Sequence, residues 1–201
     1  MKQIIIIGFS TTGKSSLIKK IKEEIPSIRR SILDTDEEIS KNYENSISNI
    51  YLQLGREKAL FEILKLESQL IENLIEKPNN LIIAAGPGLP FRENFKKYIS
   101  IKQPHVILLE NSANNIYENL KKRREELFNK LKEPRSDFGI WDIGVMVDEY
   151  NIEFDKKIAI ENIENILKQR NKTYRYFAKH TFTTSEVLSN DEIPKEILEI
   201  L

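Results

Sequence analysis

Residues 3–17 constrain the fold more than any other part of the chain, because an apolar strand leads directly into a glycine-rich loop. Residues 4–7 are four consecutive isoleucines, a run typical of a parallel strand buried on both faces. They are followed by Gly8-x-x-x-x-Gly13-Lys14-Ser15 and by residues that favour a helix. A strand, this loop and a helix, in that order, form the context in which a P-loop binds phosphate. A glycine turn without a ligand is the alternative, which the buried strand disfavours.

Each part of this loop has a chemical role in phosphate binding. Gly8 and Gly13 let backbone N–H groups turn inward around phosphate oxygens, and the following helix presents its positive N-terminal end. Lys14 can reach the β- and γ-phosphates of a nucleotide, and the Ser15 hydroxyl can ligate Mg²⁺. We therefore predict that the nucleotide is bound by Gly8, Ser10, Thr11, Thr12, Gly13, Lys14, Ser15 and Ser16.

Composition narrows the class of protein. A length of 201 residues suffices for one sizeable core and is short for two, so we expect a single domain over residues 1–201. The 31 basic and 31 acidic residues balance, which implies no strong field for nucleic acid or a membrane. The absence of cysteine excludes disulfides, thiolate catalysis and cysteine zinc sites. The apolar runs are shorter than the roughly 20 residues that span a bilayer, and we expect a cytoplasmic protein.

Apolar runs alternate with amphipathic helical stretches, which indicates an α/β fold with a parallel sheet covered by helices on both faces. Strands are expected at 3–7, 30–33, 81–85, 105–110 and 180–183. Helices are expected at 14–24, 37–75 with a break near Leu54-Gly55, 92–99, 113–128, 155–178 and 194–201. Residues 130–154 interrupt the pattern with Pro134, Gly139 and Gly144, and a loop this long in a compact domain is often a lid.

Polar or glycine-rich segments follow two further strands. Asp34 and Asp36 end the second expected strand, where one carboxylate can hold Mg²⁺ and the other can accept a hydrogen bond from a substrate hydroxyl. Capping of the next helix stays open as the alternative for either aspartate. Gly86-Pro87-Gly88 ends the third strand, where glycine allows a substrate to lie against the backbone, or simply makes a tight turn. All three strand ends should meet at one edge of the sheet.

With these motifs the chain resembles the shikimate kinase family. The similarity runs through Gly8-Phe9-Ser10-Thr11-Thr12-Gly13-Lys14-Ser15, Asp34-Thr35-Asp36, Ala84-Ala85-Gly86-Pro87-Gly88 with Asn94, the strand 106–109, and Arg170-Asn171-Lys172-Thr173-Tyr174 with Ala178. It covers most of the chain apart from about residues 121–160. The resemblance implies a P-loop kinase three-layer sandwich with a five-stranded parallel sheet in the order 2-3-1-4-5. It also implies a helical substrate-binding segment at about 34–75 and a lid at about 121–157.

The resemblance further implies roles for single residues. Asp34 would support Mg²⁺ beside Ser15, Asp36 would bind substrate hydroxyls, and Arg170 would pair with a substrate carboxylate. Gly86, Pro87 and Gly88 would lie against the substrate. Arg135 is the nearest equivalent of the family's lid arginine, which contacts the nucleotide.

The chain departs from the family in its substrate segment. The family's Gly-Glu-x-x-Phe-Arg motif corresponds here to Gly55-Arg56-Glu57-Lys58-Ala59-Leu60-Phe61, in which no arginine is in register. Because a two-point arginine grip on a carboxylate depends on position, Arg92 or Arg56 would have to replace it. We therefore expect an anionic or polar acceptor bound by Arg170 with help from Arg92 or Arg56, and weak or no activity on shikimate.

A few further residues invite a functional interpretation. His105 and His180 have no partner at metal-ligand spacing, so we expect them to be structural or on the surface. The basic run 121–124 is followed by Glu125-Glu126, which favours a solvated helix face over a phosphate-contacting arginine. Trp141 could close over the substrate or anchor its loop.

Together these features predict an ATP- and Mg²⁺-dependent kinase that phosphorylates a hydroxyl group of a small metabolite, with Lys14 and Asp36 as catalytic residues. A monomer or a homodimer is compatible with the sequence. A nucleoside or nucleotide kinase is the nearest alternative, because such kinases share the sheet and the loop. A P-loop switch that binds nucleotide without transferring phosphate is the alternative from another class. Such a switch has no use for a second carboxylate such as Asp36.

Overall fold

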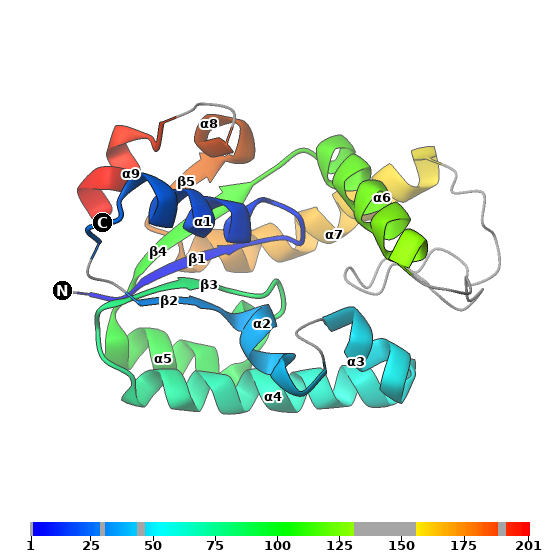
Figure 1. Ribbon diagram of the computed structural model, residues 1–201, viewed down its shortest axis with the longest axis horizontal. Helices are drawn as coiled ribbons and strands as arrows, with labels where there is room; N and C mark the ends of the chain where they lie inside the picture. Colours follow the sequence, from blue (N-terminus) through cyan, green and yellow to red (C-terminus); the bar gives the residue numbers. More distant parts are fainter. Residues whose placement is uncertain (1, 29–30, 44–46, 131–155, 189–191) are drawn as a thin grey trace.

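The computed structural model describes residues 2–28, 31–43, 47–130, 156–188 and 192–201. They contain a five-stranded parallel sheet in the order β2-β3-β1-β4-β5 (Figure 1). The strands are β1 (Ile4–Gly8), β2 (Ser31–Asp34), β3 (Leu81–Ala84), β4 (His105–Glu110) and β5 (His180–Thr183). The predicted strands, their parallel arrangement and their order are thereby confirmed.

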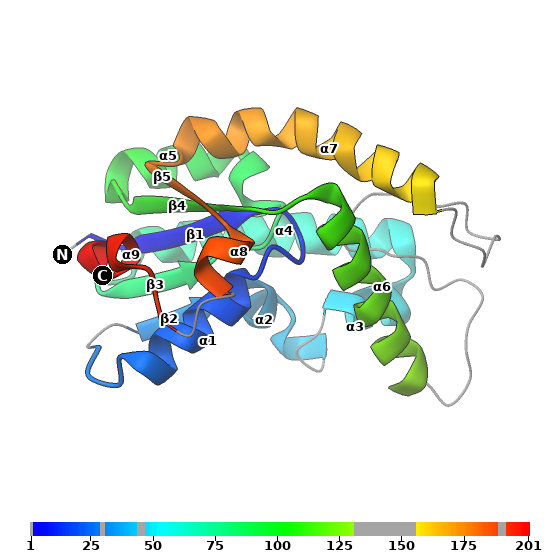
Figure 2. The same ribbon diagram turned by 90° about the horizontal axis from the view of Figure 1, so that it is seen from above.

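The isoleucines of β1 supply two hydrophobic cores, because successive side chains of a strand point to opposite faces. Ile5 and Ile7 pack with side chains from α4 (Arg56–Glu76), α5 (Glu93–Lys102) and α7 (Lys156–Phe177). Ile4 and Ile6 pack with α1 (Lys14–Glu24), α8 (Thr184–Leu188) and α9 (Lys195–Ile200) on the other face. Figures 1 and 2 show these two helical layers on either side of the sheet.

The long helix expected over 37–75 is divided into shorter elements. They are α2 (Thr35–Ile39), a 3-10 turn η1 (Lys41–Tyr43), α3 (Ile47–Leu54) and α4. The predicted break after Leu54 is present, because Gly55 has φ 72°, a conformation that favours glycine. Helix α2 begins earlier than expected, because the Asp34 side chain accepts the backbone N–H of Asp36 and caps the helix.

Three further elements complete the described chain. The 3-10 turn η2 (Leu89–Phe91) precedes α5, and α6 (Ala113–Lys130) follows β4 and packs against α7. Helix α8, which the sequence analysis missed, follows β5 directly. Arg135 and Trp141 lie outside the described residues, as does most of the interruption at 130–154. Within the described residues, no helix has the length and apolar composition needed to cross a membrane.

Candidate active site

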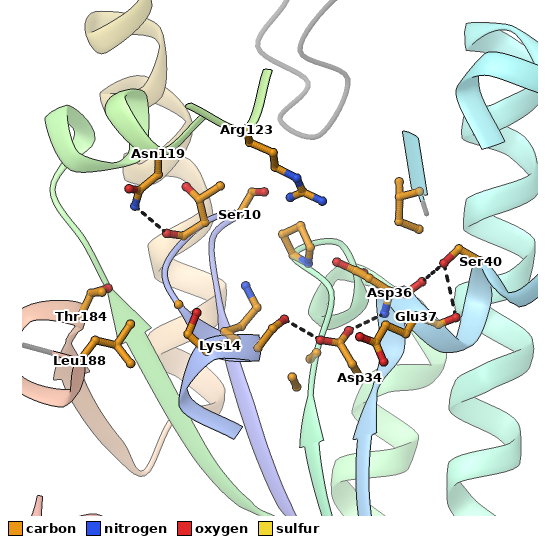
Figure 3. Close-up of a pocket in the computed structure, with 18 residues that line it drawn as sticks. Ser10, Lys14, Asp34, Asp36, Glu37, Ser40, Asn119, Arg123, Thr184 and Leu188 are labelled. Carbon is orange, nitrogen blue, oxygen red and sulfur yellow. Dashed lines mark hydrogen bonds between the residues drawn. The ribbon is translucent and has the colours of Figure 1, made fainter. Parts of the chain in front are cut away.

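A cavity of about 630 Å³ lies where β1, β2 and β3 end at their carboxyl side (Figure 3). The expectation that these strand ends meet at one edge of the sheet is therefore confirmed. From the glycine-rich loop, the cavity is lined by Ser10, Thr11, Gly13, Lys14, Ser15 and Ser16. Asp34 and Asp36 face it from the end of β2 and the start of α2. Glu37 and Arg123 line it as well, so the cavity is bordered by the glycine-rich loop, two cationic side chains and three carboxylates.

Gly8 and Gly13 are each required by a positive φ angle and by a different close neighbour. Gly8 has φ 149°, and a Cβ atom there would collide with the backbone carbonyl oxygen of Leu109. Gly13 has φ 83°, and a Cβ atom there would collide with the side chain of Leu188 in α8. Thr12 is buried and holds the loop from within, because its hydroxyl donates to the Phe9 carbonyl at 2.9 Å. The loop therefore keeps its shape before any ligand binds.

Lys14 is almost fully buried, and its ammonium group binds two backbone carbonyls of the loop. It donates to the carbonyl oxygens of Gly8 at 3.0 Å and of Phe9 at 2.7 Å. Burial lowers the pKa of Lys14 to about 8, although the carboxylates of Asp36 and Asp34 act in the opposite direction. Because phosphate oxygens are negatively charged, a bound nucleotide would stabilise the protonated form.

Ser15 and Asp34 form an oxygen pair at the edge of the cavity. The Ser15 hydroxyl donates to Asp34 Oδ2 at 2.5 Å, while Oδ1 accepts the Asp36 N–H at 3.0 Å. Asp34 therefore caps α2 and also faces the loop, so both roles considered for it are compatible. Mg²⁺ in kinases is usually held by one or two protein oxygens together with phosphates and water. Ser15 and Asp34 could supply such oxygens; among the described residues, no cluster of three metal-binding side chains occurs.

A second cavity, of about 180 Å³, adjoins the first, and Asp36 lines both. Four of the other residues expected to bind substrate also line it, namely Pro87, Gly88, Arg92 and Arg170. Gly86 instead lies behind Asp36, where a Cβ atom would collide with Asp36 Oδ1. The Gly86 N–H donates to the Thr35 hydroxyl at 2.6 Å, which fixes this turn to the start of α2.

One side of the second cavity carries a buried ion pair that the sequence analysis missed. Arg92 Nε lies 3.1 Å from Glu67 Oε2 and also donates to the Gly88 carbonyl at 3.3 Å. Burial raises the pKa of Glu67 to about 7, and this effect outweighs the opposing attraction of Arg92. A Cβ atom on Gly88 would lie 2.7 Å from Glu67 Oε1, so the glycine makes room for the carboxylate. The only signal in the sequence is one acidic side chain on an otherwise apolar stripe of α4.

Arg170 occupies the other charged position of the second cavity. Its guanidinium carbon lies 5.5 Å from the ring centroid of Phe9 and 5.4 Å from that of Phe91, distances typical of cation–π contacts. One turn further along α7, the Tyr174 hydroxyl donates to the Pro87 carbonyl at 2.8 Å. This hydrogen bond joins α7, which carries Arg170, to the turn at residues 86–88 beside the cavity. The side chain of Arg56 lies outside the described part of the chain.

Helices α6 and α8 contribute residues that local motifs did not reveal. Arg123, on α6, lines the large cavity and enters it from above in Figure 3. One turn earlier, Asn119 Nδ2 donates to the Thr11 carbonyl at 3.2 Å. Thr184, on α8, donates to the Thr12 carbonyl at 2.9 Å. The sequence favoured a solvated face for 121–124, whereas Arg123 lines the large cavity in the structure.

The two histidines lie away from these cavities. His105 and His180 begin β4 and β5, at the amino ends of the strands, and their rings stack with centroids 4.8 Å apart. Burial, followed by the proximity of His180, lowers the pKa of His105. This position fits the structural or surface role expected for both residues.

The strand order, with the phosphate loop after β1 and a carboxylate between two cavities, defines a kinase of the P-loop class. The family model for shikimate kinase matches residues 10–201. The chain therefore belongs to the shikimate kinase family and is an ATP-dependent small-molecule kinase.

Individual relatives agree with this assignment. A shikimate kinase of Pelotomaculum thermopropionicum is 29% identical over 182 residues, which cover 85% of this chain and 98% of the relative. A shikimate kinase of Thermodesulfovibrio yellowstonii is 32% identical over 136 residues, covering 67% and 72%. The solved shikimate kinase of Acinetobacter baumannii in complex with shikimate superposes with a TM-score of 0.61 at 16% identity, over 90% of this chain and 83% of that one. The last comparison bears on the fold alone.

Proposed function

We propose that the protein transfers the γ-phosphoryl group of Mg²⁺-bound ATP to a hydroxyl group of a small, shikimate-like acceptor. The position of Asp36 carries this proposal, because its carboxylate lines both the large cavity and the smaller one beside it. A carboxylate at such a junction can orient a hydroxyl in one cavity toward a phosphate in the other.

The nucleotide side is assigned to the loop and its neighbours. Loop amides and Lys14 would bind the phosphates, while Ser15 and Asp34 would supply protein oxygens to Mg²⁺. Arg123, which lines the large cavity, would add a further positive charge there. Such groups stabilise the charge that develops on the transferred phosphoryl group.

The transfer step then needs little covalent chemistry from the protein. The acceptor hydroxyl donates a hydrogen bond to Asp36 and attacks the γ-phosphorus. A new oxygen–phosphorus bond forms as the bond from that phosphorus to the bridging oxygen of ADP breaks. Asp36 orients the hydroxyl and accepts its proton, which in-line phosphoryl transfer requires.

The acceptor side is assigned to the second cavity. Arg170 would pair with an anionic group of the acceptor, while Arg92 is already engaged with Glu67. Shikimate, which the Acinetobacter relative binds, has a carboxylate and ring hydroxyls and is the reference compound. Weak or no activity on shikimate itself stays a prediction for this chain, because α4 places Leu60, Ile63, Leu64 and Glu67 at the cavity.

The proposed organisation is one kinase domain over residues 1–201, with the acceptor-binding segment at about 34–75. A lid at about 121–157, with Arg135 on the nucleotide, stays a prediction from the sequence. That the protein is a monomer or a homodimer in the cytoplasm also stays a prediction from the sequence.

Measuring ATP consumption against a panel of acceptors tests the proposal. The panel contains shikimate, other polyols, sugar acids and nucleosides, with a reaction lacking acceptor as the control for hydrolysis. We expect ADP release to depend on a small hydroxylated acid, and mass spectrometry to detect that acid with one added phosphoryl group. Equal ADP release without any acceptor, or phosphorylation of nucleosides alone, would contradict the proposal.

A further inference from the structure

Two kinds of side chain line the smaller cavity. The charged ones are Asp36, Glu67, Arg92 and Arg170. The apolar ones come from α2, α3 and α4, namely Ile39, Ile47, Tyr51, Leu60, Ile63 and Leu64. A ligand that fills this cavity therefore meets both charged groups and hydrocarbon.

Two of the apolar residues that line the cavity are partly exposed. Leu60 and Leu64 are separated by one turn of α4, and their exposed fractions are 44% and 39%. Most large apolar residues of the described chain are instead buried in the cores on the two faces of the sheet. Covering the two leucines with an apolar surface is favourable, because hydrocarbon is removed from water.

A polar surface would not gain in the same way. A hydroxyl placed against Leu60 and Leu64 would lose water without receiving a hydrogen-bond partner from them, which is unfavourable. The groups in the cavity that can pair with polar atoms of a ligand are charged side chains, among them Asp36 and Arg170. The preferred ligand therefore combines polar groups with an apolar portion.

We infer that the acceptor is an amphipathic hydroxy acid with fewer ring hydroxyls than shikimate. Its phosphorylated hydroxyl lies at Asp36, its carboxylate at Arg170, and a ring face or alkyl portion without hydroxyls against Leu60 and Leu64. Leu64 is then a specificity-determining residue. This inference rests on the proposed function for the reaction itself, but its binding preference can be measured without turnover.

Isothermal titration calorimetry in the presence of Mg²⁺ and ADP tests the preference. The two ligands are shikimate and 3-hydroxycyclohexane-1-carboxylate, which has the same ring size and carboxylate but a single hydroxyl. We expect the monohydroxy acid to bind about 10- to 100-fold more tightly than shikimate, the range that mismatched polar and apolar contacts produce. Tighter or equal binding of shikimate would overturn the inference, as would the absence of binding by both compounds.

Variants of α4 then locate the preference. Leu64→Asn keeps the branching and the number of side-chain heavy atoms, and should weaken binding of the monohydroxy acid about tenfold while changing shikimate binding less than threefold. Phe61→Asn is the matched control, because Phe61 lies on the same helix, is 71% exposed and does not line the cavity. Leu60→Asn is the second variant should Leu64→Asn fail to fold. If the cavity variants and Phe61→Asn leave the ratio of the two affinities unchanged, the leucines do not set specificity.

Turnover separates this inference from the proposed function. If the monohydroxy acid binds more tightly but neither compound is phosphorylated, the inference holds and the proposed reaction fails. If shikimate binds more tightly and is phosphorylated, the reaction holds and the inference fails.

Discussion

The Ser15 hydroxyl donates a hydrogen bond of 2.5 Å to Asp34 Oδ2, joining the first turn of α1 to the end of β2. The other carboxylate oxygen of Asp34 accepts the backbone N–H of Asp36. One side chain thus fixes the residue that faces both cavities relative to the phosphate loop. A substitution at the proposed metal site should therefore also shift the position of Asp36, which is proposed to orient the acceptor hydroxyl.

Replacing Lys14 by methionine should remove catalysis without weakening the fold. Losing one preorganised charge from such a site commonly costs on the order of 10² to 10³ in rate. Burial has already lowered the pKa of Lys14 to about 8. A depressed lysine pKa means that burial of the charge destabilises the folded state near pH 7. Methionine relieves this cost but loses the hydrogen bonds to the Gly8 and Phe9 carbonyls, so the free energy of unfolding should change little. Steady-state kinetics and urea unfolding at pH 7 check both expectations; near-full activity would place catalysis elsewhere.

Asp36→Asn should separate catalysis from nucleotide binding. The amide keeps the shape of the side chain but loses the charge that orients the acceptor hydroxyl and accepts its proton. We expect turnover to fall by about 10² or more while the Kd of ATP changes less than threefold. Titration with ATP and an assay with the true acceptor measure the two quantities. A large loss of ATP affinity with unaltered turnover would assign Asp36 to the nucleotide site.

Arg123→Ala tests the cationic side of the large cavity. Since the arginine lines the cavity proposed to hold the nucleotide, we expect kcat to fall on the order of 10²-fold as charge on the phosphoryl group is left uncompensated. Lys122→Ala is the matched control, because Lys122 is exposed on the same helix and does not line the cavity. Similar kcat values for the two variants would return Arg123 to the solvated face that the sequence favoured.

Arg170→Ala should weaken acceptor binding and leave ATP binding unchanged. A hydrogen bond to a charged group contributes roughly 1.5 to 3 kcal/mol, so the acceptor KM should rise about 10- to 100-fold. Lys172→Ala, two residues along α7, does not alter the cavity lining and serves as the control. An unchanged acceptor KM would remove Arg170 from the site.

Glu67 should make stability depend on pH. Its pKa is about 7 in the folded protein against 4.5 for the unperturbed group, so the folded state binds more protons between these values. The free energy of unfolding should therefore fall as pH rises from about 4.5 to 7, by about 1 to 3 kcal/mol from this group. Urea unfolding at pH 5, 6 and 7.5 should show a smaller fall for Glu67→Gln. Glu62→Gln, on the same helix, should behave like the wild type.

The sheet and the phosphate loop could be predicted from the sequence because their signals are local. Four isoleucines before Gly8, and apolar runs before Asp34 and Gly86, identify buried strands without knowledge of the rest of the chain. The roles of Glu67 and Arg123 could not be predicted in this way. Their positions depend on how α4 and α6 lie across the carboxyl edge of the sheet, which no short motif specifies. The same long-range packing pairs Arg92 with Glu67, an arrangement that the sequence did not indicate.

The two halves of α4 have different surroundings. Leu70, Ile71 and Leu74 in its second half are buried in the core beneath the sheet, whereas Leu60 and Leu64 in its first half border the smaller cavity. Substitutions in the first half can therefore change which molecule is accepted while the second half keeps the helix in place. A lineage can in this way acquire a new acceptor through few amino-acid replacements, without rebuilding the nucleotide machinery on the other side of Asp36.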